Sequence, residues 1–109
     1  MFSEFFDTPL TDKKEKILLI SIIGTLETIK RKSISINEAE KYLFSPHMIS
    51  KLRKNECSGK IIDILERGCE LEDIASLLPQ SLTKNIDELQ EQALKIMGEY
   101  QTYDKEFWV

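Results

Sequence analysis

The residue types that most often carry chemistry are few in this sequence and poorly spaced for it. His47 is the only histidine, and Cys57 and Cys69 are twelve residues apart. A structural zinc site needs four ligands in short paired spacings, and a cysteine nucleophile needs a base and an oxyanion-binding loop. The four glycines, at positions 24, 59, 68 and 98, are isolated, so no phosphate-binding loop is present. The sequence therefore predicts no enzyme activity, no cofactor and no metal site.

The densest charged segment is acidic and spans residues 66–73, with the sequence ERGCELED. Its four carboxylates, Glu66, Glu70, Glu72 and Asp73, form a candidate partner-binding surface for a basic protein. A local explanation competes with this one. Acidic side chains in the first turn of a helix are stabilised by the helix dipole, by about 0.3–1 kcal/mol each.

The charge is unevenly distributed along the chain. Residues 11–54 hold ten Lys and Arg against five Asp and Glu, whereas residues 55–109 hold five against twelve. Such a division is typical of a basic patch, of an acidic patch, or of two halves that attract each other on folding.

The basic half supports an alternative function in nucleic-acid binding. Residues 36–54 resemble a helix-turn-helix, with basic side chains on the second helix and apolar ones at the expected inner positions. These are Lys51, Arg53 and Lys54, and Ala39, Ile49 and Leu52. Two features argue against it: Leu43 stands where the turn usually has glycine, and the pI of about 5.1 is low for a nucleic-acid-binding domain. We therefore rank nucleic-acid binding behind protein binding and keep it as the alternative function.

The apolar residues recur every three or four positions, which predicts helices throughout. Helices are expected over 11–31, 35–44, 45–54, 60–67, 70–78 and 82–107. Thr11, the Ser35–Glu38 capping box and Ser45-Pro46 mark three of the starts. Gly68 is expected to end the fourth helix in a left-handed conformation.

The first helix is apolar on nearly all faces, which predicts a buried central position. We expect its core residues to be Leu19, Ile22, Ile23 and Leu26. Gly24 within it is expected to admit the close approach of another helix.

The last quarter of the chain has apolar residues at alternating spacings of four and three. They are Leu82, Ile86, Leu89, Ala93, Ile96, Tyr100, Tyr103 and Phe107. This heptad pattern predicts either a long helix packed on its own domain or a seam shared with a second copy. Aromatic residues also gather at both chain ends, including Phe2, Phe5 and Phe6. We expect a two-fold homodimer through Tyr100, Tyr103, Phe107 and Trp108.

Size and composition predict one helical domain over residues 1–109. The fold class is all-α, a compact bundle of five or six helices. The chain is too apolar for disorder and too poor in cysteine for a disulfide scaffold. It has neither an apolar run long enough to cross a membrane nor a signal-peptide pattern, so we expect a cytoplasmic protein without membrane contact.

Two segments resemble a family of short bacterial proteins of unknown function. They are residues 34–46, ISINEAEKYLFSP, and residues 68–79, which begin GCELEDI and end in Leu78-Pro79. The resemblance covers nearly the whole chain and implies a small intracellular bacterial protein, with no activity to carry over. From the residues themselves we expect a non-enzymatic protein-binding module, of which an immunity or antitoxin type that masks a basic toxin is one version.

Overall fold

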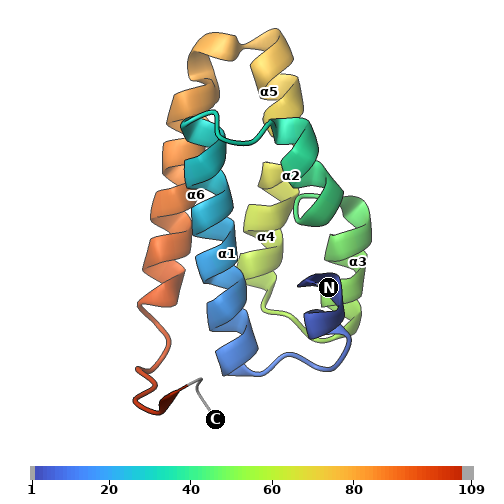
Figure 1. The fold of residues 1–109 in the computed structure, drawn as a ribbon, viewed down its shortest axis with the longest axis vertical. Helices are drawn as coiled ribbons and strands as arrows, with labels where there is room; N and C mark the ends of the chain where they lie inside the picture. The colour runs from blue at the N-terminus through green and yellow to red at the C-terminus, as the bar shows by residue number, and fades with distance from the viewer. Residues whose placement is uncertain (1, 107–109) are drawn as a thin grey trace.

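The computed structural model describes residues 2–106. The chain begins with a short 3-10 helix, η1 (Phe2–Phe6), and a second one, η2 (Pro79–Ser81), precedes the last helix. The α-helices, labelled in Figure 1, are α1 (Asp12–Lys30), α2 (Ile36–Tyr42), α3 (Pro46–Lys54), α4 (Gly59–Gly68), α5 (Leu71–Leu77) and α6 (Leu82–Met97). Within the described residues the fold is all-α. Because α2 and α5 have only seven residues each, the expected count of five or six helices depends on how these short helices are treated.

Three helix starts follow from their capping residues. The hydroxyls of Thr11, Ser35 and Ser45 accept hydrogen bonds from the backbone N–H groups of Lys14, Glu38 and Met48. Each bond satisfies a donor that the first turn of a helix leaves without an intrahelical partner. The sequence predicted these starts correctly.

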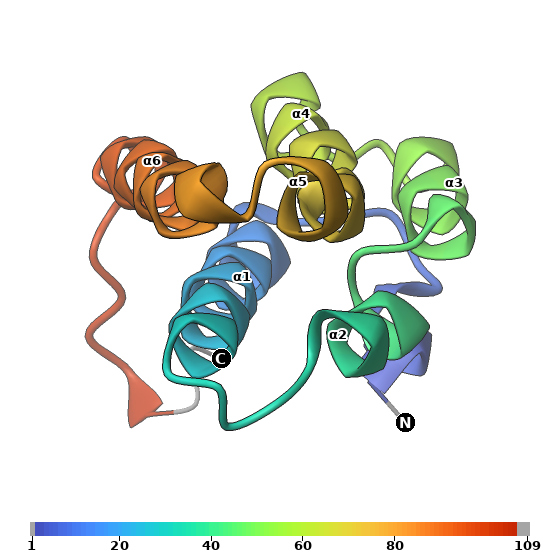
Figure 2. The same ribbon diagram turned by 90° about the horizontal axis from the view of Figure 1, so that it is seen from above.

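The helices form two layers within a molecule of 42 × 25 × 24 Å. Viewed from above, α6, the α4–α5 pair and α3 make one layer, and α1 and α2 lie against it (Figure 2). α1 packs most extensively on α6, which runs antiparallel to it. None of the helices within residues 2–106 is long and apolar enough to cross a membrane.

The core is contributed by all six α-helices and by η1. Its fully buried members include Phe6, Leu18, Leu19, Ile22, Leu26, Leu43, Phe44, Leu52, Ile61, Ile64, Leu65 and Leu71. Burial of these side chains is the main favourable contribution to stability. Of the four core residues expected on α1, Leu19, Ile22 and Leu26 are buried, and Ile23 is partly buried at the edge of the core.

The prediction that α1 is buried on all sides was wrong, because one face of the helix lies in solvent. Ile20 on that face is 48% exposed. Gly24 is exposed as well, and a Cβ atom built on it would meet nothing within 4 Å. Among residues 2–106, no other helix approaches α1 at Gly24.

Close packing against a glycine, which was expected at Gly24, occurs instead at Gly68. It is the last residue of α4 and does not adopt a positive φ, so the predicted left-handed cap is not formed. A Cβ atom on Gly68 would lie 2.5 Å from Cδ1 of Phe44. Glycine is required here because the Phe44 ring packs directly on the helix backbone.

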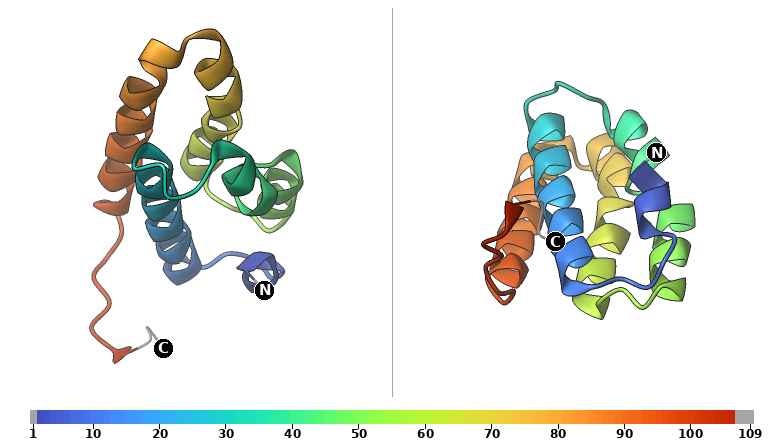
Figure 3. Two further views of the ribbon diagram at one scale, coloured as in Figure 1. Left: turned by 45° about the horizontal axis from the view of Figure 1, so that its top comes forward. Right: turned by 60° about the horizontal axis from the view of Figure 1, so that its bottom comes forward.

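The long C-terminal helix ends ten residues earlier than predicted. α6 stops at Met97, and residues 98–106 continue without α-helix, so Tyr100 and Tyr103 do not belong to a helical seam. Figure 3 shows this segment leaving α6 beside the first turns of α1. Phe107, the last position of the expected seam, lies outside the described residues.

The N-terminal aromatic residues pack within the chain. The Phe2 ring makes edge-to-face contacts with Phe6 and Tyr42, at centroid distances of 5.2 and 5.8 Å. The side-chain amide of Asn55 donates to the Phe6 carbonyl oxygen at 2.8 Å. η1 is therefore covered by α2 and α3, and the C-terminal segment is not needed to bury it.

Candidate protein-binding groove

A groove between α3 and the α4–α5 junction holds two of the four carboxylates that the sequence singled out. It encloses about 500 Å³ and is lined by Pro46, Ile49, Ser50, Arg53, Glu66, Cys69 and Glu70. We call this set of residues the acidic groove. The positions on α3 share one face of that helix, and Glu66, Cys69 and Glu70 come from the end of α4 and the turn that follows.

The floor of the acidic groove is apolar. The Ile49 side chain is 8% exposed and joins the core, and Pro46 begins α3 beside it. Cys69 is half-buried, and its pKa is raised, chiefly by burial and further by Glu40, Glu66 and Glu70. Its thiol is therefore neutral at physiological pH and acts as a small apolar group.

The rim of the acidic groove carries one ion pair. A guanidinium nitrogen of Arg53 lies 3.1 Å from a carboxylate oxygen of Glu66, and both side chains are about half exposed. Exposed pairs of this kind contribute only about 0–1 kcal/mol. A competing cation can therefore displace Arg53 from Glu66 at small cost.

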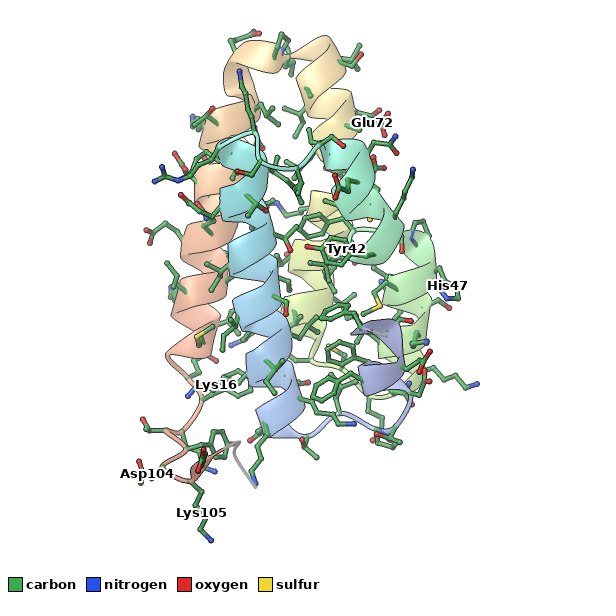
Figure 4. All side chains as sticks on the ribbon, viewed as in Figure 1. Lys16, Tyr42, His47, Glu72, Asp104 and Lys105 are labelled. Atoms are coloured by element: carbon green, nitrogen blue, oxygen red, sulfur yellow. The ribbon has the colours of Figure 1, made fainter. Side chains whose placement is uncertain are left out.

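The other two acidic candidates lie outside the groove. Glu72 and Asp73 occupy the first turn of α5, as the helix-dipole explanation requires. Figure 4 shows Glu72 where α5 meets α2. There the pKa of Glu40 is raised, chiefly by the neighbouring Glu72 carboxyl group and then by burial. The four predicted residues thus form two separate pairs.

Two of the three basic residues of α3 are occupied by contacts within the chain. The Lys51 ammonium lies 2.6 Å from Oδ1 of Asp7 and donates to the Ser3 carbonyl oxygen at 3.3 Å. Arg53 pairs with Glu66. The two helices of the helix-turn-helix resemblance are present and Ala39, Ile49 and Leu52 are buried, but two of its three cations already have partners.

His47 and the cysteines are not brought together as a catalytic pair. His47 and Tyr42, labelled in Figure 4, line a separate hollow of about 340 Å³ with Phe2 and Met48, whereas Cys69 lines the acidic groove. Cys57 lies between α3 and α4, and burial followed by the charge of Glu15 raises its pKa to about 12. Within residues 2–106 no group of three or more His, Cys, Asp or Glu side chains is placed to hold a metal ion.

A buried polar network at the start of α4 escaped the sequence analysis. Glu15 is 8% exposed; one carboxylate oxygen accepts from Tyr100 Oη at 2.6 Å and the other from Ser58 N at 2.7 Å. The sequence did contain a signal for this network, because Glu15 lies on the same helix face as the buried Leu18, Leu19 and Ile22. A carboxylate on an apolar face needs polar partners when it is buried.

The two tyrosines expected to mediate self-association contact α1 of their own chain. Burial and the hydrogen bond to Glu15 raise the pKa of Tyr100. The Tyr103 ring lies beneath the ammonium groups of Lys13 and Lys16, at 5.6 and 5.5 Å from its centroid. Phe107 and Trp108 lie outside the described residues.

These features define a small helical protein with an acidic groove at one edge and a C-terminal segment fastened to α1. Residues 11–109 match the family described as "Protein of unknown function (DUF3969)", and the chain belongs to this family. No curated protein and no solved structure matches the chain.

Proposed function

We propose that this protein is a non-enzymatic protein-binding module whose acidic groove takes a basic segment of a partner protein. The observation that carries the proposal is the combination of an apolar floor, at Ile49, Pro46 and Cys69, with carboxylates at Glu66 and Glu70 on its rim. Acidic surfaces of this kind accelerate association with basic partners by electrostatic steering. An immunity or antitoxin type of protein that covers a basic toxin is one version of this function.

The geometry suggests how such a segment would bind. An apolar side chain would lie on Pro46 and the small exposed part of Ile49, where it displaces water from an apolar surface, and flanking Lys or Arg side chains would reach Glu66 and Glu70. Arg53 competes for Glu66 from within the chain. Binding therefore requires Arg53 to turn aside, which costs little because its ion pair is exposed.

The test uses a fluorescein-labelled peptide with one leucine between two pairs of arginines, and a control peptide with glutamates in place of the arginines. Fluorescence anisotropy should show salt-dependent binding of the basic peptide only. Glu66→Gln with Glu70→Gln should weaken binding about tenfold, the equivalent of about 1.4 kcal/mol. Glu72→Gln with Asp73→Asn removes the same charge outside the groove and should change binding less than about twofold.

Arg53→Ala provides a gain-of-binding variant. Removing the internal competitor should tighten binding of the basic peptide about two- to fivefold, because Glu66 is then unpaired. Equal weakening by the two carboxylate double variants, or no effect of Arg53→Ala, would contradict binding in the groove. Retention of duplex DNA that is lost on charge reversal of Lys51, Arg53 and Lys54 would favour the nucleic-acid alternative instead.

A further inference from the structure

Two exposed apolar side chains lie on the seam between α1 and α6, on the opposite side of the molecule from α3. Ile20 is 48% exposed and Leu94 is 50% exposed. Ile23 and Met97 are partly buried and pack on the core. We call these four residues the α1–α6 strip. Single exposed apolar residues are ordinary on a protein surface, so what matters is whether these residues are contiguous.

The contacts between α1 and α6 show that the four residues of the strip are contiguous. Lys30 Nζ lies 2.8 Å from Asp87 Oδ1, and Lys16 Nζ donates to the Gln101 carbonyl oxygen at 3.0 Å. Between them, the Gln90 side-chain amide donates to the Ile23 carbonyl oxygen at 3.4 Å. This antiparallel register sets Leu94 level with Ile23 and Met97 level with Ile20. All four residues of the strip therefore lie within about one helical turn along the seam.

The surface of α1 beside the strip is open to a second helix. Gly24 follows Ile20 by one turn on the exposed face, and a Cβ atom there would meet nothing within 4 Å. A helix with glycine at an exposed position lets a neighbouring backbone or a bulky side chain approach closely. No helix in the described part of the chain occupies this place.

The charges on α1 are arranged so that the helix complements a copy of itself. Lys13 precedes Ile20 by seven residues and Glu27 follows it by seven, so all three lie on one side of the helix. If two copies meet antiparallel across a two-fold axis at Ile20, Lys13 of each lies opposite Glu27 of the other, where it would compete with Arg31, Lys30 and Gln90 of that chain for the carboxylate. A parallel arrangement would set like charges opposite each other. The charge pattern thus selects the two-fold, antiparallel arrangement.

We propose that the α1–α6 strip is the contact surface of a weak two-fold homodimer in which Ile20 meets its own copy and Lys13 pairs with Glu27 of the second chain. The same patch serves both subunits, as closed two-fold symmetry requires. Tyr103 then acts indirectly, because its ring lies beneath the ammonium groups of Lys13 and Lys16. The acidic groove remains accessible on both subunits, since α3 and α6 lie at opposite edges of their layer (Figure 2).

The experiment measures the mass of the full chain by sedimentation equilibrium, from about 10 to about 300 µM, where mass action favours association. The wild type should shift from monomer towards dimer over this range. Ile20→Glu and Leu94→Glu should each leave a monomer at every concentration. Leu77→Glu changes a side chain that is 76% exposed but lies outside the strip, and it should dimerise like the wild type.

A charge exchange tests the antiparallel pairing. Lys13→Glu and Glu27→Lys should each weaken dimerisation, and the double variant should restore it, because it recreates both ion pairs in reverse. Circular dichroism confirms that each variant is folded, which matters for Glu27 because it also pairs with Arg31 and Lys30 and accepts a hydrogen bond from Gln90 of α6. A wild-type monomer at the highest concentration, a dimer that survives Ile20→Glu and Leu94→Glu, or the absence of rescue by the charge exchange would each overturn the proposal.

Discussion

The Tyr100 hydroxyl donates a 2.6 Å hydrogen bond to Oε1 of Glu15, across 85 positions of the chain. The other oxygen of Glu15 accepts from the backbone N–H of Ser58, directly before α4. One buried carboxylate thus joins the first turns of α1, the start of α4 and the segment after α6. Hydrogen bonds to a charged, buried group are among the stronger ones in proteins.

Tyr100→Phe should therefore destabilise the protein although it removes a single oxygen atom. We expect the free energy of unfolding to fall by about 1.5–3 kcal/mol, because Glu15 loses a charge-assisted hydrogen bond while it stays buried. Urea denaturation followed by circular dichroism measures this change. In a Glu15→Gln background the same substitution should cost distinctly less, and equal costs in both backgrounds would show that the two residues are not coupled.

The Cys57 thiol should react slowly in the folded protein. Burial and the nearby Glu15 charge raise its pKa to about 12 from an ordinary 9.0, so very little of the reactive thiolate exists at pH 8. Labelling of the Cys69→Ser variant with a chromogenic disulfide reagent should be about 10²–10³-fold slower when folded than when denatured. Rapid labelling of the folded variant would show that Cys57 is neither buried nor suppressed by charge.

The local structure could be predicted from the sequence where it depends on neighbouring residues. The hydroxyls of Thr11, Ser35 and Ser45 cap helices at the predicted positions, because capping involves atoms only a few residues apart. The acidic groove could not be predicted from neighbouring residues alone. Its residues come from α3 and the end of α4, and only their packing reveals that Glu66 and Glu70 face Ile49 while Glu72 and Asp73 do not.

The C-terminal prediction failed because two different structures can produce the same spacing. Tyr100 and Tyr103 continue the heptad pattern of α6, yet the helix ends at Met97, before Gly98. Glycine is a poor helix former, and Tyr100 can satisfy the buried Glu15 outside the helix. The spacing of apolar residues shows where a helix could continue. It does not show that Glu15, far away in the chain, needs the Tyr100 hydroxyl as a hydrogen-bond donor.

Glu40 and Glu27 should give opposite pH dependences. Folding raises the pKa of Glu40, chiefly through Glu72, so its stabilising contribution is complete below the ordinary value of 4.5 and is lost as the pH rises through the raised value. Glu40→Gln should therefore be at least as stable as the wild type at pH 7, with a gain below about 1 kcal/mol, and lose this advantage near pH 4.

Glu27 serves as the control for that measurement. Its pKa is lowered to about 2, chiefly by the Gln90 hydrogen bond and then by Arg31. Its contribution is therefore present above pH 4.5 and lost as the pH falls towards 2. Glu27→Gln should destabilise the protein at pH 7 and have a much smaller effect near pH 2. Thermal melts across this pH range, in low salt, test both residues, and parallel curves for the two variants would contradict both assignments.

Two of the helical glycines, Gly24 and Gly68, should respond in opposite directions to the same substitution. Gly24→Ala adds a methyl group in open space and should stabilise α1 by about 0.5–1 kcal/mol. Gly68→Ala places a methyl group 2.5 Å from a Phe44 ring that is 1% exposed and has no room to move aside, and it should cost about 1–3 kcal/mol. Phe44→Leu should relieve part of that clash in the double variant. Urea denaturation at a low protein concentration keeps the α1–α6 strip uncovered, so that the Gly24 result reflects the monomer. If Gly68→Ala stabilised the protein as Gly24→Ala does, the close packing of Phe44 on α4 would not be the reason for a glycine at position 68.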